Sequence, residues 1–266
     1  MRLVQKLVRM FYPLGATRAV LRGPLKGRHF FVVPGMGVTY AYAGNGINWR
    51  FLAHHVKKGD VVYDIGGNCG QMALYFSVWA GPGGSVYTFE PAPHNMQTLR
   101  KNVELNQMRN VEIVVAAVAS DSQPRTFCFD SEWHTMGTLR DVMIKPDAWA
   151  TTFQVPCVTL DELLLDGSRP PQLIKIDVES AGLGVIEGAA NLIENWLPKI
   201  YFVLHAADEN APELKALRML RDRWGYRLLD LSGVEQNPGR CFVVCAGHGF
   251  CGRGRDVKTS LAERDG

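Results

Sequence analysis

The chain has 266 residues, of which 47% are hydrophobic and 21% charged, and its formal net charge is +3 at pH 7. These values are typical of a globular protein that forms one large domain with extensions. So small a net charge gives no electrostatic argument for a nucleic-acid partner. The longest apolar runs, such as Val111 to Ala119, are well short of the roughly 20 residues of a transmembrane helix, so they predict buried strands.

The six cysteines are scattered along the chain, and no two of them form a C-x-x-C pair. Zinc sites built from thiolates normally use such pairs, so we expect no structural zinc site and assign no metal ligands. Several of the cysteines lie in apolar, strand-like stretches, where a free thiol behaves as a small hydrophobic side chain. Reduced thiols are typical of a reducing compartment, and we therefore expect a cytoplasmic location.

The N-terminal segment is strongly basic. Residues 1–28 contain seven lysines and arginines and no acidic residue. Leu3, Leu7 and Met10 recur at helical spacing, which predicts a basic amphipathic helix over Met1 to Tyr12. Such a helix is suited to weak contact with an anionic membrane surface or an acidic partner. The simpler interpretation, which we prefer, packs the three apolar side chains against the rest of the protein.

Beyond residue 28 the pattern changes to short strands and turns, and then, from Val61, to apolar strands that alternate with helical segments. This alternation predicts a parallel sheet with crossover helices. The expected strands are Val61 to Ile65, Ser85 to Phe89, Val111 to Val118, Leu173 to Val178, Ile200 to Leu204, Tyr226 to Leu231 and Cys241 to Ala246. The expected helices are Ile47 to Val56, Gln71 to Trp79, Pro93 to Asn106, Val185 to Trp196 and Ala211 to Trp224.

Residues 120–158 are less regular, with strand-like pieces at Arg125 to Phe129 and Phe153 to Val158. Thr159 and Glu162 then form the pattern of a capping box at the start of a helix. The whole pattern predicts an α/β, Rossmann-like fold with a mostly parallel seven-stranded sheet and helices on both faces. We expect an N-terminal extension of helix and short strands over residues 1–58, a main domain over 59–247 and a polar tail over 248–266.

The glycine-rich segment Asp64 to Gly70 directly follows a strand and precedes a helix. Ligands of such sheets bind outside the carboxyl ends of the strands, and we expect glycine there because a side chain would collide with a ligand over the turn. The G-x-G-x-x-G fingerprint of dinucleotide-binding proteins fails, since Asn68 and Gln71 occupy its third and sixth places counted from Gly66. Asp64 is expected to point at the ligand, where it suits a cationic amine better than a diphosphate.

Glu90 ends the second expected strand, twenty-six positions after Asp64. A carboxylate there can accept hydrogen bonds from both hydroxyls of an adenosine ribose. Enzymes that use NAD share this acid, so the signal depends on its combination with a loop that is unsuited to diphosphate. The alternative is that Glu90 is only a solvated strand end before Pro91.

Three blocks of sequence carry a resemblance to a known family. They are Gly59 to Asn68; Glu90 to Asn95 with Leu99 and Asn102; and Thr159 to Asp161 together with Leu173 to Glu179. From about Asp60 to Leu231 the chain resembles the FkbM-type methyltransferases, a branch of the S-adenosylmethionine-dependent enzymes. The resemblance implies a class I methyltransferase fold and methylation of a substrate oxygen, often on a sugar or polyketide-like molecule.

The resemblance also implies which residues hold S-adenosylmethionine. They are Asp64, Gly66, Asn68 and Glu90, and we place Ala117, near the end of the third expected strand, in the same site. One departure from the family is clear. The third block usually continues Asp-Val-Glu-Gly-Ala-Glu, whereas Gly182 here replaces the second glutamate. Whether this replacement reduces activity is left open.

Candidate catalytic residues follow the central strands. Asp177 and Glu179 are expected to face the cleft, where they could orient a substrate hydroxyl, accept its proton or help to bind a divalent metal. Glu179 could instead cap the next helix. His205 ends the following strand and has a pKa range suited to a general base, although a lone histidine at a strand end is more often structural. His134 is a weaker candidate, and the sequence leaves the base undecided.

Other functions are weighed against methylation of a small molecule or sugar hydroxyl. Methylation of nucleic-acid bases usually employs an Asn/Asp-Pro-Pro-aromatic loop after the fourth strand, and the segment Asp177 to Ser180 contains no proline. A methyltransferase-like protein that binds the cofactor without catalysis is made plausible by the missing glutamate. An NAD-dependent oxidoreductase is a further, weaker alternative, and the oligomeric state is left open.

Overall fold

The computed structural model describes residues 15–31, 49–129, 137–139, 141, 151–205, 211–229 and 243–246. The helix expected over Met1 to Tyr12, the candidate His134 and the expected tail over 248–266 lie outside these residues. Within them, no helix is both long enough and apolar enough to span a membrane.

The centre of the structure is a sheet with the strand order β13-β14-β12-β11-β3-β4-β5. Its strands are β3 (Val61–Ile65), β4 (Ser85–Phe89), β5 (Val111–Val114), β11 (Leu173–Ile176), β12 (Lys199–Phe202), β13 (Arg227–Leu229) and β14 (Val243–Ala246). The five strands from β12 to β5 pair in parallel, whereas β14 is antiparallel to both β12 and β13. The expectation of a mostly parallel sheet is therefore confirmed.

Strand order reverses beside β3, because the chain runs outward to β4 and β5 and then returns to β11 on the other side. In sheets of this kind the crevice at such a reversal, outside the carboxyl ends of the strands, is where ligands bind. The crevice lies between β3 and β11, and the expected bounds of β3 and β4 agree with the structure.

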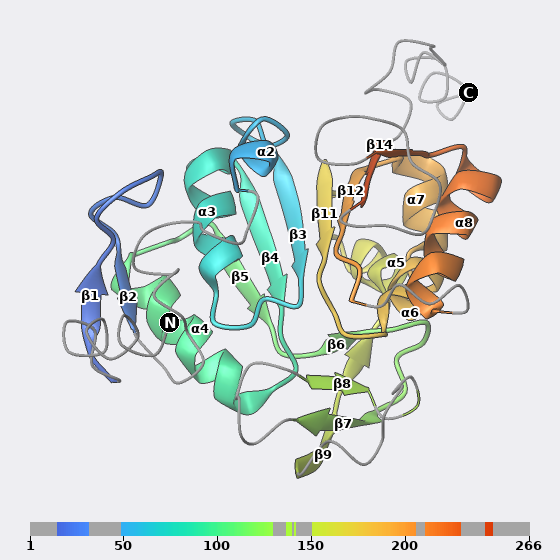
Figure 1. Ribbon diagram of the computed structural model, residues 1–266, viewed down its shortest axis with the longest axis horizontal. Coiled ribbons are helices and arrows are strands. Elements are labelled where there is room, and N and C mark those ends of the chain that lie inside the picture. The colour runs from blue at the N-terminus through green and yellow to red at the C-terminus, as the bar shows by residue number, and fades with distance from the viewer. Residues whose placement is uncertain are drawn as a thin grey trace, which may run out of the picture.

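Helices cover both faces of the sheet (Figure 1). They are α2 (Trp49–Ala53), α3 (Gln71–Ala80), α4 (Pro93–Leu105), α5 (Leu160–Leu165), α6 (Gly182–Glu187), α7 (Ala190–Trp196) and α8 (Pro212–Trp224). Side chains of β3 alternate between two cores: Val61 and Tyr63 pack with residues of α5 to α8, while Val62 packs with α2 and α3. The expected capping box starts α5, with Thr159 and Glu162 bonded to each other's backbone.

A short hairpin of β1 (Thr17–Ala19) and β2 (His29–Phe31) lies along α4 (Figure 1). Asn102 of α4 joins this hairpin to the glycine-rich loop. Its Oδ1 accepts from the Phe31 amide at 2.7 Å, and its Nδ2 donates to the Cys69 carbonyl at 2.8 Å. The buried amide of Asn102 therefore fixes the loop from behind.

The single strand expected over Val111 to Val118 is wrong, because the chain leaves the sheet after Val114. Ala117 lies in a separate strand, β6 (Ala117–Val118), which pairs in parallel with β10 (Cys157–Val158). A further sheet with the order β8-β7-β9 lies at the carboxyl ends of the main strands (Figure 1). Its strands are β7 (Arg125–Phe129), β8 (Gly137–Leu139) and β9 (Thr151–Val155).

The single helix expected over Val185 to Trp196 is also wrong, since α6 and α7 are separated at Gly188 and Ala189. A Cβ atom at Gly188 would lie 2.0 Å from the carbonyl oxygen of Ala119. The chain that follows β6 thus passes directly against this point, and only glycine allows so close an approach.

Gly182, where the resembled family usually has a glutamate, packs against the ring of Phe202. A Cβ atom at this position would lie 2.2 Å from Phe202 Cζ, and Phe202 itself is fully buried on β12. The departure from the family pattern therefore has a steric basis, because the ring of Phe202 occupies the space that a side chain at position 182 would need.

We predict that Gly182→Ala lowers the free energy of unfolding by about 1–3 kcal/mol, the usual cost of overpacking a core. Gly184→Ala in the same helix is the matched control, because its Cβ would meet only an ordinary contact at 3.5 Å from the Ser120 amide nitrogen. There the replacement is expected to stabilise the helix by about 0.5–1 kcal/mol. Urea denaturation midpoints give both values, and equal midpoints for the two variants would remove the steric explanation.

Candidate functional site

A cavity of about 280 Å³ lies at the carboxyl ends of β3, β4 and β11. Phe127 of β7 and Thr138 and Leu139 of β8 line it from the small sheet. Seven of the eight residues predicted for the site also line this one cavity: Gly66, Asn68, Glu90, Ala117, Asp177, Glu179 and His205. The eighth, Asp64, does not.

Gly66 holds the glycine-rich loop against the neighbouring strand. Its φ is +80°, and a Cβ atom there would lie 2.1 Å from the backbone oxygen of Asp177. Glycine is therefore required by the protein's own backbone, whereas the sequence suggested a collision with the ligand. This close approach places the end of β3 beside the end of β11.

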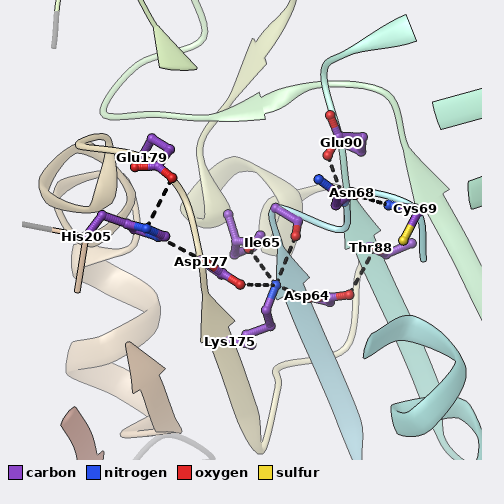
Figure 2. Close-up of polar contacts among 11 residues, drawn as sticks. Asp64, Ile65, Asn68, Cys69, Thr88, Glu90, Lys175, Asp177, Glu179 and His205 are labelled. Carbon is purple, nitrogen blue, oxygen red and sulfur yellow. Dashed lines mark hydrogen bonds and ion pairs between the residues drawn. The ribbon is translucent and has the colours of Figure 1, made fainter. Parts of the chain in front are cut away.

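Glu90 is buried and joins the loop to the start of α4. Its Oε2 accepts from the Asn68 amide at 2.8 Å (Figure 2). Its Oε1 accepts from the Ala92 amide at 2.9 Å. The side chain of Asn95 donates to Oε1 at 3.3 Å. Burial raises the pKa of Glu90, while these donors favour its charged form. The alternative of a solvated strand end is wrong.

Asp64 does not line the cavity and forms a buried ion pair. Its Oδ1 lies 2.9 Å from Nζ of Lys175, and its Oδ2 accepts from Thr88 at 3.3 Å. Asp64 and Lys175 are register partners on the parallel strands β3 and β11, so both side chains leave the same face of the sheet. The expectation that Asp64 faces the ligand is therefore corrected, because its cationic partner comes from within the chain.

Lys175 lines the cavity and is a residue that the sequence analysis missed. Its ammonium group donates to the Gly66 carbonyl at 2.9 Å and lies 3.6 Å from Asp177 Oδ2. Burial alone would lower the pKa of Lys175, but Asp64 and Asp177 outweigh burial and raise it, so the side chain stays cationic. A lysine within the buried strand Leu173–Ile176 was the signal available in the sequence.

The structure brings the three candidate catalytic side chains together (Figure 2). His205 Nε2 lies 3.0 Å from Asp177 Oδ1, and its Nδ1 lies 3.2 Å from Glu179 Oε1. The helix α6, which follows Glu179, has no side-chain cap, so the capping role considered for Glu179 is wrong. Acids and bases alternate along a row of five side chains: Asp64, Lys175, Asp177, His205 and Glu179.

The pKa values of these groups diverge. Burial would raise the pKa of Asp177, but Lys175 and His205 outweigh it and hold the pKa below its ordinary value. Burial raises the pKa of Glu179, despite the opposing effect of His205. Burial would lower the pKa of His205, but Asp177 and Glu179 together raise it.

Glu213, in the first turn of α8, is a second residue that the sequence analysis missed. It is fully buried, and its Oε1 accepts from the Ser180 amide at 3.1 Å. Ser180 has a φ of +58°, in the left-handed region. Thr138 Oγ1 donates to the backbone oxygen of Glu179. The turn that carries Glu179 is thus held from both α8 and β8.

Among the described residues, no three or more histidine, cysteine, aspartate or glutamate side chains are arranged to hold a metal ion. The acids and the imidazole of this cavity instead face one another and Lys175. The arrangement can move or hold a proton in the cavity that Glu90, a buried carboxylate with hydrogen-bonding capacity for a ligand, also lines.

Two curated relatives resemble parts of this chain. Hexuronic acid methyltransferase AglP from Haloferax volcanii is 25% identical over 55% of this chain and 56% of its own length. The 31-O-demethyl-FK506 methyltransferase FkbM from Streptomyces tacrolimicus is 25% identical over 63% of this chain and 74% of its own length. The chain therefore spans only about half the length of the first of these relatives.

A crystal structure of methyltransferase FkbM from Methylobacillus flagellatus KT superposes with a TM-score of 0.46 and 17% identity, covering 70% of this chain and 42% of that one. The sequence model of the methyltransferase FkbM domain matches residues 64–228, which include the end of β3, the glycine-rich loop, Glu90 and the entire acid–base row. The match covers more than half of the chain, and the protein belongs to the FkbM methyltransferase domain family.

Proposed function

We propose that this protein is an S-adenosylmethionine-dependent methyltransferase that methylates a hydroxyl oxygen of a small molecule or sugar, with residues 59–247 as its catalytic domain. One observation carries the proposal: a single cavity holds Glu90 beside the glycine-rich loop and also the acid–base group of Asp177, Glu179 and His205. Membership of the FkbM family supports the reaction. The names of the two relatives, one acting on a hexuronic acid and one on 31-O-demethyl-FK506, support the class of acceptor.

The residues present fit the cofactor at its adenosine end. The Glu90 carboxylate would hold the ribose hydroxyls, since three donors leave it with acceptor capacity for further hydrogen bonds. The backbone of Gly66 to Asn68 would lie along the cofactor. When bound, S-adenosylmethionine supplies an activated methyl group on a cationic sulfur, and the carboxylates of the lining, the ionised Asp177 among them, would complement this charge.

Catalysis in this family of reactions consists mainly of positioning and of removing a proton from the acceptor. The small sheet is suited to positioning, because Phe127 and Leu139 add apolar surface and Thr138 adds a hydroxyl to the same cavity. Acceptor specificity is therefore assigned to residues 120–158, as part of this proposal. In this proposal Asp64 acts indirectly, because it holds Lys175 beside Asp177.

We predict that the protein binds S-adenosylmethionine and that Glu90→Gln weakens the affinity. Hydrogen bonds to a charged acceptor contribute about 1.5–3 kcal/mol each, so losing the charge should cost at least about tenfold in Kd. Glutamine is preferred to alanine because it keeps an oxygen for the Asn68 or Ala92 amide and so preserves the loop. Isothermal titration calorimetry measures the change.

Glu187→Gln is the matched control for this experiment, because Glu187 is an exposed acid on α6 outside the cavity lining. It should bind the cofactor as the unaltered protein does. NADH is the competing ligand. Binding of NADH without binding of S-adenosylmethionine would replace the proposal with the oxidoreductase alternative.

We further predict that methyl-labelled S-adenosylmethionine transfers its label to a hydroxylated acceptor. The acceptors offered are methyl glycosides of neutral sugars and of a hexuronic acid, together with an extract of small molecules, and mass spectrometry detects the added methyl group. Methyl ether formation is the expected result. Cofactor binding with no labelled product from any of these acceptors would favour a binding protein without catalysis.

A further inference from the structure

The environment of His205 selects one protonation state. A neutral imidazole has one donor nitrogen and one acceptor nitrogen, whereas the imidazolium cation has two donors. Here Nε2 faces Asp177 Oδ1 at 3.0 Å and Nδ1 faces Glu179 Oε1 at 3.2 Å. In either neutral tautomer an unprotonated nitrogen would oppose a carboxylate oxygen, so the geometry favours the cation.

The groups around His205 on the packed elements strengthen this preference. Asp177 and Glu179 follow β11, and the buried Glu213 of α8 adds a third negative influence. Lys175 is the opposing cation, but it lies beyond Asp177 and contacts the other oxygen of that carboxylate. The net effect on His205 is attraction for a proton.

The two carboxylates that hold His205 are not equivalent. Both oxygens of Asp177 face cations, Oδ1 toward His205 and Oδ2 toward Lys175, which makes Asp177 a weak base. Glu179 directs Oε1 toward His205, and among the described residues no hydrogen bond or ion pair engages its Oε2. Its side chain is 26% exposed and lines the cavity. Glu179 therefore has the oxygen that is available to a ligand.

We propose that His205 is a positioning residue, held as an imidazolium between Asp177 and Glu179, and that the carboxylate of Glu179 accepts the proton of the substrate hydroxyl. This inference rests on the proposed function and identifies its base. The hydroxyl oxygen forms the new bond to the methyl carbon as the carbon–sulfur bond breaks, and that electron pair stays on sulfur. The hydroxyl proton moves to Glu179, so the carboxylate becomes a neutral acid.

The divergent pKa values agree with these roles. Two carboxylates whose pKa values are pushed apart commonly divide electrostatic and proton-transfer tasks between them. Asp177, with its lowered pKa, stays charged until the pH falls below its ordinary value of 3.8. Glu179, whose pKa is raised above 4.5, is the stronger base of the two.

The pH dependence has a defined sign. Because the pKa of His205 is raised, its ion pairs are fully present below its ordinary value of 6.5 and are lost as the pH rises through the raised value. Methyl transfer should therefore increase with pH as Glu179 loses its proton and decrease again as His205 becomes neutral.

Nitrogen NMR of the full chain tests the state of His205 without any ligand. In protein labelled with ¹⁵N-histidine, the His205 signals are those missing from the His205→Gln variant. We expect both ring nitrogens at imidazolium positions at neutral pH, and a pKa that decreases in Asp177→Asn and in Glu179→Gln but not in the control Glu187→Gln. A neutral-tautomer pattern for His205 at neutral pH would overturn the proposal.

Kinetics with an acceptor methylated by the unaltered protein test the base. Glu179→Gln should lower the methyl-transfer step by about 10²–10⁴-fold, the usual range for loss of a general base, and change cofactor affinity far less. His205→Gln should lower it less and remove the decrease at high pH. The reverse order, with the large loss in His205→Gln and little effect in Glu179→Gln, would make the imidazole the base. Failure of the proposed function is recognised separately, by the absence of S-adenosylmethionine binding in calorimetry.

Discussion

The rest of the site depends on the contacts that the buried ammonium group of Lys175 makes. It lies between two carboxylates, Asp64 and Asp177, and also binds the carbonyl oxygen of Gly66 in the glycine-rich loop. Without this cation the carboxylates would lose their shared counter-charge, and removing one partner from a buried pair typically costs about 3–5 kcal/mol. One side chain therefore fixes the charge of the site, the end of β11 and the loop after β3 together.

From Lys175 the charges alternate outward toward the cavity. Asp64 has no exposed side-chain surface, whereas the side chain of Asp177 is 38% exposed and those of His205 and Glu179 are 23% and 26% exposed. The inner pair of Asp64 and Lys175 is thus shielded from solvent, whereas the outer members are exposed enough to meet a ligand. Because Asp177 faces two cations and Glu179 only one, the same row that stabilises the fold also separates the pKa values of the two acids.

The features predicted correctly from the sequence are those that depend on residues close together in the chain. The bounds of β3 and β4 and the capping box at Thr159 follow from apolar runs and turn residues that are neighbours in the chain. The direction of Asp64 did not follow, because it depends on its register with Lys175, more than a hundred positions later. The two elements predicted as continuous are interrupted where distant segments meet: Ala117 and Val118 pair with β10 instead of continuing β5, and the helix is divided at Gly188, which the chain after β6 approaches closely at Ala119.

Position 182, where the family usually has a glutamate and this chain has glycine, also depends on residues that are distant in the chain but close in space. Comparison with the family motif finds glycine there, and the ring of Phe202 explains why no side chain fits. A carboxylate nevertheless reaches this turn, because Glu213 arrives from α8 and accepts from the Ser180 amide. The motif that ends at position 182 therefore does not contain all the acids around His205. The fold brings Glu213 to the same turn from α8, which lies outside the motif.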